Sequence, residues 1–135
     1  MPANHSETPL AKTLNLRDDQ RVWFHAMPES VQDEIGEYAL DLIFVADPAE
    51  GIDAAHIFVT TREELDSLLA QLRHQIAADG HIWVSWPDQE SGIASGIDER
   101  DVREAGLALG LVDTKQCEVD EKWSGLKLVI RKELR

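Results

Sequence analysis

Side chains that could contact a ligand recur where the apolar runs of the chain end. The set comprises His25, Asp47, Thr60, Ser85, Trp86, Asp120, Glu121, Trp123 and Ser124. These runs read as strands of a mostly parallel sheet, and in such sheets ligands bind beyond the carboxyl ends of the strands. The sequence therefore predicts one ligand-binding edge built from these residues.

The turn after the first run argues against conventional nucleotide binding. A nucleotide or adenosyl group needs glycines there, so that the backbone can approach it closely. This chain instead has HAMPES at residues 25–30, with side chains and a proline in the way. Asp47 stands where an acid often binds ribose hydroxyls, although a lone acid at a strand end is more often a turn or capping residue.

The chain also lacks the residues that several other common chemistries require. No glycine-rich run ends in Gly-Lys followed by Ser or Thr, so a phosphate-binding loop of that type is not expected. The five histidines have no paired metal spacing, and Cys117, the single cysteine, cannot complete a zinc set. Ser85, His25 and Asp47 could meet as a triad, but Ser85 lacks the flanking glycines of a nucleophile elbow.

The four tryptophans fall into two groups. Trp23 and Trp83 lie inside strand-like runs and are predicted to pack in the core. Trp86 and Trp123 fall at strand ends, where an indole ring could cover a pocket and its N–H could meet a ligand. The alternative is that both rings close the top of the core. In either case the sequence predicts that they are neighbours.

The elements that position these residues alternate between strand and helix. Strands are predicted at residues 21–26, 38–46, 54–60, 81–86, 111–119 and 126–132. Helices are predicted near residues 9–14, after Pro28, from Thr60 to Ile76, and at about 98–109. A domain at 9–135 follows a flexible tail at 1–8.

The third helix has the clearest pattern. Its apolar stripe comprises Leu65, Leu68, Leu69, Leu72 and Ile76. Thr60 and Glu63 are predicted to form its capping box. Gly80 is predicted to end the following turn with a positive φ.

Alternating strands and helices predict an α/β three-layer sandwich, a Rossmann-like, mostly parallel sheet of about six strands. The last two strands are joined by residues 120–125, which is too short for a crossover, so they should form an antiparallel hairpin. The fifth strand then runs parallel to the fourth, and its turn joins the ligand-binding edge.

The composition limits the classes of partner that the chain is expected to bind. The chain has 135 residues, 26 acidic and 13 basic, with a formal net charge of -13. This charge opposes contact with a phosphate backbone, so nucleic acid is not expected as a partner. No apolar run is long enough to span a bilayer, and residues 1–19 show neither an apolar signal core nor an Arg-rich pattern, so a cytoplasmic location is expected by default.

Two segments resemble a known family. They are IFVTTREELDSLLAQLRHQIAADGHIWVSWP and REAGLALGLVDTKQCEVDEKWSGLKLVIRK, with Ser85-Trp86-Pro87 and VDEKWSGLK as their most specific parts. The chain is similar to short bacterial proteins grouped as a domain of unknown function, and the resemblance implies a truncated, methyltransferase-like Rossmann fold. It implies no catalytic residues. Relatives usually carry two lysines after Ser-Trp-Pro, whereas this chain has Asp88 and Gln89, which removes the basis for anion binding by that loop.

Three functional hypotheses follow. The first is a domain without conventional catalysis that binds a small molecule or a protein partner at the predicted edge. The second is a divergent methyltransferase that binds S-adenosylmethionine, with Asp47 on the ribose. The third is self-association of the chain through a sheet edge or the exposed rim.

Overall fold

The computed structural model describes residues 8–135, so most of the predicted tail lies outside the described residues. Its helices are α1 (Leu10–Thr13), α2 (Glu29–Gly36), α3 (Arg62–Arg73) and α4 (Glu99–Ala108), with short 3-10 turns η2 (Pro48–Glu50) and η3 (Lys132–Leu134). Its strands are β1 (Arg21–His25), β2 (Ile43–Phe44), β3 (Ile52–Phe58), β4 (Ile76–Pro87), β5 (Leu111–Glu118) and β6 (Trp123–Ile130).

The strands form one six-stranded sheet in the order β2-β1-β3-β4-β6-β5. The first four strands of the chain pair in parallel, while β6 is antiparallel to both β4 and β5. The strand β5 therefore runs in the same direction as β4. The predicted α/β class, the mostly parallel sheet and the closing hairpin are confirmed.

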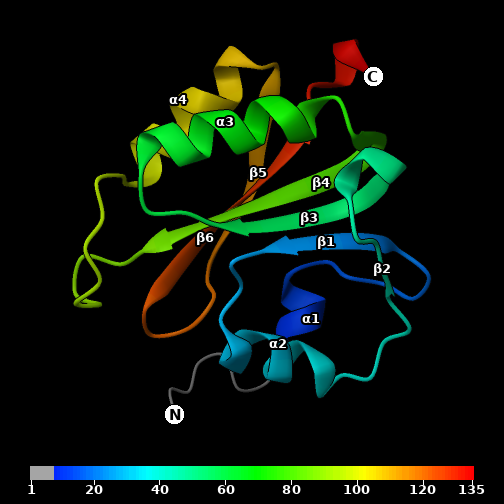
Figure 1. The fold of residues 1–135 in the computed structure, drawn as a ribbon, viewed down its shortest axis with the longest axis horizontal. Coiled ribbons are helices and arrows are strands. Elements are labelled where there is room, and N and C mark those ends of the chain that lie inside the picture. The colour runs from blue at the N-terminus through cyan, green and yellow to red at the C-terminus, as the bar shows by residue number, and fades with distance from the viewer. Residues whose placement is uncertain (1–7) are drawn as a thin grey trace.

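Helices cover both faces of the sheet, as Figure 1 shows: α3 and α4 lie over one face, and α1 and α2 over the other. The first core contains the buried leucines of α3 and residues such as Ile82, Val84 and Trp86. The second core contains Leu14, Val31 and Trp83. Successive side chains of a strand point to opposite faces, so β4 supplies both cores in alternation.

The second predicted strand, residues 38–46, is much shorter in the structure. Only Ile43 and Phe44 pair with β1. The backbone of Tyr38 and Ala39 bonds back to the end of α2, and Asp41 exchanges hydrogen bonds with residues 18 and 19. These bonds occupy backbone N–H and C=O groups that a longer strand would need for pairing. Both residues of β2 are exposed.

The predicted turn at Gly80 is wrong. The strand β4 runs without interruption through Asp79 and Gly80, and Gly80 does not have a positive φ. Glycine is required there for its small size, because a Cβ atom at residue 80 would lie 2.5 Å from the carbonyl oxygen of Asp53. The pairing of β3 with β4 shifts register between Ile52 and Ala54, and Gly80 allows the two backbones to approach closely at this irregularity.

The start of α3 lies one residue later than predicted. Thr61 is its N-cap, since its hydroxyl accepts a hydrogen bond from the Glu64 N–H at 3.1 Å. The Thr60 N–H donates to the Glu64 carboxylate at 3.3 Å. Ile76, predicted at the end of this helix, is instead the first residue of β4. For α4 the prediction is confirmed, with a capping box at Asp98 and a positive φ at Gly110.

Candidate functional site

A hollow of about 730 Å³ lies at the carboxyl end of β4. Its lining comprises Trp86, Pro87, Asp88, Gln89, Ile93, Ser95, Gly96, Ile97, Asp98, Glu99, Asp101, Gln116, Glu118 and Ser124. The strands β4, β5 and β6, the connection 88–98 and the first turn of α4 contribute these residues. We call this cavity the edge hollow. Its volume is within the range of small-molecule sites.

The loop that walls the edge hollow is attached at both ends. The Asp88 N–H donates to the Lys122 carbonyl oxygen at 2.8 Å, and the Gly96 N–H donates to the Thr60 carbonyl oxygen at 2.9 Å. Its far end continues into the capping box of α4. The hollow is therefore bounded by segments that hydrogen bonds position, and Thr60 contributes by its backbone.

The ionisable side chains that line the edge hollow are all acidic. They are Asp88, Asp98, Glu99, Asp101 and Glu118. Three of them already have partners: Asp98 and Asp101 cap α4, and Glu99 pairs with Arg103 at 2.6 Å. Asp88 and Glu118 form no ion pair within residues 8–135. The lining therefore favours a ligand that carries positive charge or hydrogen-bond donors.

The structure brings two of the predicted site residues together in this cavity, Trp86 and Ser124. They face each other directly across β4 and β6, so their side chains lie on the same face of the sheet. Trp86 is 6 % exposed. Its indole N–H forms no hydrogen bond with any described residue.

The predicted contact between Trp86 and Trp123 is wrong. Trp123 precedes Ser124 on β6 and therefore points to the opposite face, where its ring packs edge-on against Phe58 with centroids 5.0 Å apart. Trp123 belongs to the second core, whereas Trp86 belongs to the first. The two rings lie on adjacent strands with the sheet between them.

Ser85 was predicted at the rim and is instead fully buried. Its hydroxyl forms a hydrogen bond of 2.7 Å with Nε2 of His56, which stacks on Phe58. Burial, together with the charge of His81, lowers the pKa of His56 to about 3. Ser85 and His56 form a neutral polar pair within the second core, and the sequence did not predict that pair.

The remaining predicted residues lie apart from the edge hollow. Nε2 of His25 is 3.0 Å from the Glu64 carboxylate. Asp47 accepts the Ala49 N–H at 2.9 Å and caps η2, which is the capping role considered for it. Asp120 accepts two backbone N–H groups of the β5–β6 turn, and Glu121 is exposed in that turn.

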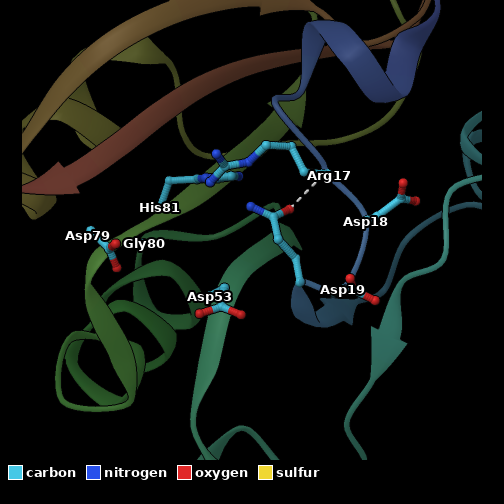
Figure 2. A pocket seen from close by; sticks show the side chains of 8 residues that line it. Arg17, Asp18, Asp19, Asp53, Asp79, Gly80 and His81 are labelled. Carbon is cyan, nitrogen blue, oxygen red and sulfur yellow. Dashed lines mark hydrogen bonds between the residues drawn. The ribbon is translucent and has the colours of Figure 1, made fainter.

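A second hollow of about 320 Å³ lies at the opposite end of the strands, in the amino-terminal part of β4. The sequence analysis did not predict it. Arg17, Asp18, Asp19, Gln20, Asp53, Asp79, Gly80 and His81 line it. Figure 2 shows the Arg17 and His81 side chains reaching toward each other across it. It joins three segments distant in sequence, so no local motif could reveal it.

His81 in this second hollow is a neutral base. Burial lowers its pKa to about 4, and the charges of Lys127 and Arg17 contribute. Its Nε2 atom is buried without a hydrogen-bond partner among the described residues. Burial also raises the pKa of the Cys117 thiol to about 11, so this thiol is not activated as a nucleophile.

Residues 8–135 show neither a metal-binding cluster nor a membrane-spanning helix. Within that range no three His, Cys, Asp or Glu side chains gather in an arrangement that could bind a metal ion. None of its helices combines the length and apolar character needed to cross a membrane.

Several solved structures with a similar fold are methyltransferases. A SAM-dependent methyltransferase from Aquifex aeolicus superposes with a TM-score of 0.63 at 13% identity, covering 90% of this chain and 88% of that one. Magnesium protoporphyrin IX methyltransferase from Synechocystis PCC 6803 with bound SAH gives 0.59 at 14% identity, covering 93% and 83%. At this identity the likeness shows the methyltransferase-like fold alone.

Sequence comparisons point to one family. No curated protein matches the chain. A family model described as "Protein of unknown function (DUF3052)" matches residues 11–132. This match spans nearly the whole chain and agrees with the resemblance drawn from its motifs, so the chain belongs to the DUF3052 family of unknown function.

Proposed function

We propose that this protein acts as a binding domain without conventional catalysis, and that it takes a small ligand, or a group of a protein partner, in the edge hollow. The observation that carries the proposal is the cavity of about 730 Å³ beside Trp86 and Ser124, at the carboxyl edge where sheets of this class bind ligands.

The lining supports a cationic ligand group. Five of the lining residues are acidic, and no Lys, Arg or His is among them. Asp88 and Glu118 are free of ion pairs within the described chain, and Trp86 lines the same cavity, so its emission can report on binding. Amines, and the Lys or Arg side chains of a peptide, are the matching chemical class.

Fluorescence titration with spermidine and arginine methyl ester tests the proposal, with citrate as an anionic control. We expect the cations to change tryptophan emission in the wild type and in Trp123→Phe, and to leave it unchanged in Trp86→Phe. Glu118→Gln with Asp88→Asn should weaken binding about tenfold, whereas Glu121→Gln, outside the hollow, should have no effect. Equal responses in Trp86→Phe and the wild type would place binding elsewhere.

S-adenosylmethionine binding is the alternative function, because the fold occurs in methyltransferases and one solved neighbour contains SAH. The turn after β1 offers that cofactor little access, since the His25–Glu64 contact and Pro28 occupy it. Asp47, the candidate ribose ligand, is engaged as a cap.

Titration calorimetry with S-adenosylmethionine separates the two functions. Our proposal expects no heat at high micromolar cofactor. Heat that is lost in Asp47→Asn and retained in Trp86→Phe would establish the alternative and contradict our proposal.

A further inference from the structure

The far edge of the sheet exposes apolar side chains. The edge strand β2 consists of Ile43, which is 44 % exposed, and Phe44, which is 66 % exposed, and Tyr38 nearby is 41 % exposed. Short edge strands in soluble proteins usually carry charged side chains that discourage pairing. Here both residues of the strand are apolar and exposed to water. Covering them with a partner would be favourable, because apolar surface would be removed from water.

The backbone of this edge can accept another strand. The Ile43 N–H donates to the Gln20 carbonyl oxygen and the Val45 N–H to that of Val22, so these groups face inward toward β1. Alternate residues of a strand bond to opposite sides. The N–H and C=O of Phe44 therefore face outward, where no described strand pairs with them.

A small apolar hollow of about 130 Å³ opens beside β2. Phe24, Gln32, Ile35, Gly36, Leu40, Leu42 and Phe44 line it. Cavities of similar volume and lining accept a benzene-sized group. The hollow is therefore large enough for one apolar side chain of a docked segment.

The charge around this edge is predominantly negative, with Arg21 beside Ile43 as the nearby cation. Residues 22–61 contain no Lys or Arg and eight acids, which are Glu29, Asp33, Glu34, Glu37, Asp41, Asp47, Glu50 and Asp53. Asp33, Glu37 and Asp41 are exposed and alternate along the chain with residues that line the apolar hollow. Among the eight, only Glu50 lies within 4 Å of a basic group, Arg21, in the described chain.

We propose that β2, Tyr38 and the apolar hollow form a docking surface for an extended segment of another polypeptide in which apolar residues alternate with Lys or Arg. The free backbone groups of Phe44 add the segment as a strand, the hollow takes one apolar side chain, and the carboxylates pair with its cations. A second copy of this chain fits poorly, because two surfaces with the same negative charge would repel each other. This surface is separate from the edge hollow.

Selection from a displayed library of random twelve-residue peptides tests the proposal, followed by fluorescence anisotropy of the enriched peptides. We expect enrichment of apolar residues alternating with Lys or Arg. Phe44→Ser should weaken binding at least tenfold, and the triple variant Asp33→Asn, Glu37→Gln, Asp41→Asn at least fivefold. The triple variant changes only exposed side chains, so it stays informative if Phe44→Ser folds poorly.

Leu107→Ser is the matched control, because Leu107 is 53 % exposed on α4, on the other side of the sheet. It should leave binding unchanged. Absence of basic, apolar peptides after selection would overturn the proposal, as would peptides that bind Phe44→Ser as tightly as the wild type. Light scattering that shows a wild-type dimer abolished by Phe44→Ser would also overturn it, since the occupant would then be a second copy.

Discussion

The two sides of the sheet differ in how completely they are buried. In the half built from β4, β6 and β5, the strand β4 has twelve residues, and those from Gly80 to Pro87 are all buried. In the half that ends at β2, the outermost strand has two residues, both exposed. The other edge strand, β5, is also mostly exposed, but its exposed residues are largely polar. The strand β4 is therefore tightly enclosed, while β2 leaves an apolar surface open to partners.

The two halves also differ in charge. Lys115 donates to the Thr13 carbonyl oxygen at 2.6 Å and Lys127 to the Asn15 side chain at 3.1 Å, so cations of the hairpin attach the end of α1 and the residues after it to the sheet. Around β2 the charged residues are mostly acids, with Arg21 as the neighbouring cation. Because most of β4 is buried and β2 is exposed, a change that disturbs the backbone of β4 should cost far more than one near β2.

Gly80→Ala should give the largest effect, a loss of about 3 kcal/mol in the free energy of unfolding. The new Cβ would lie 2.5 Å from the Asp53 carbonyl oxygen, and neither backbone can move without breaking the pairing of β3 with β4. Urea denaturation followed by circular dichroism measures the change. A loss below about 1 kcal/mol would show that β4 is less constrained than its burial indicates.

Trp83→Phe should cost about 2.5 kcal/mol. The ring is 1 % exposed, and its N–H donates to the Leu14 carbonyl oxygen at 2.8 Å, so the variant leaves a cavity and an unpaired acceptor. Trp23→Phe is the control, since that half-buried ring forms no hydrogen bond within the described chain, and its cost should be clearly smaller. Equal costs in urea denaturation would show that the bond to Leu14 contributes little.

The buried histidines predict a loss of stability in acid. The folded pKa of His81 is lowered to about 4 from an ordinary value of 6.5, so the unfolded chain binds more protons between these values. Stability is complete above pH 6.5 and falls as the pH drops toward 4. At pH 5 the loss is about 2 kcal/mol for this histidine.

The variant His81→Gln tests this assignment. Its unfolding free energy should fall by about 2 kcal/mol less than that of the wild type between pH 7.5 and pH 5. The loss that remains belongs to His56, whose pKa is lowered further. Parallel pH profiles for the two proteins would mean that His81 is not the titrating group.

Gly36→Ala should give the smallest effect, a gain of about 0.5 kcal/mol in stability. Gly36 is the last residue of α2, and a Cβ atom there would meet nothing within 4 Å. The same change thus has opposite signs in the strand β4 and in the helix α2, which thermal unfolding of Gly36→Ala beside Gly80→Ala would show. A destabilised Gly36→Ala would mean that the β2 half is packed more tightly than its exposure suggests.

Much of the fold could be predicted because its signals are local. The leucine spacing predicted α3, Asp98 and Gly110 marked the ends of α4, and the short link after Val119 required a hairpin. The errors came from competition between local and distant bonds. Gly80 reads as a turn residue in sequence, but its small size serves the contact with Asp53.

The candidate site was predicted less well. Trp86 and Ser124 were correctly placed at the carboxyl edge, while Ser85 and Trp123 were assigned to the same surface and lie on the other face. The sequence analysis did not identify residues 88–98 as the wall of the cavity. Their position depends on hydrogen bonds to Thr60 and Lys122, which are distant in sequence.

The sequence by itself determined the order and type of the main elements, and hence which residues stand at strand ends, because hydrophobic periodicity and capping residues act within a few positions. Only the tertiary structure decided which face of the sheet each side chain occupies. Neighbouring residues of a strand point to opposite faces, and the register between strands, such as Trp86 opposite Ser124, comes from pairing across the whole chain.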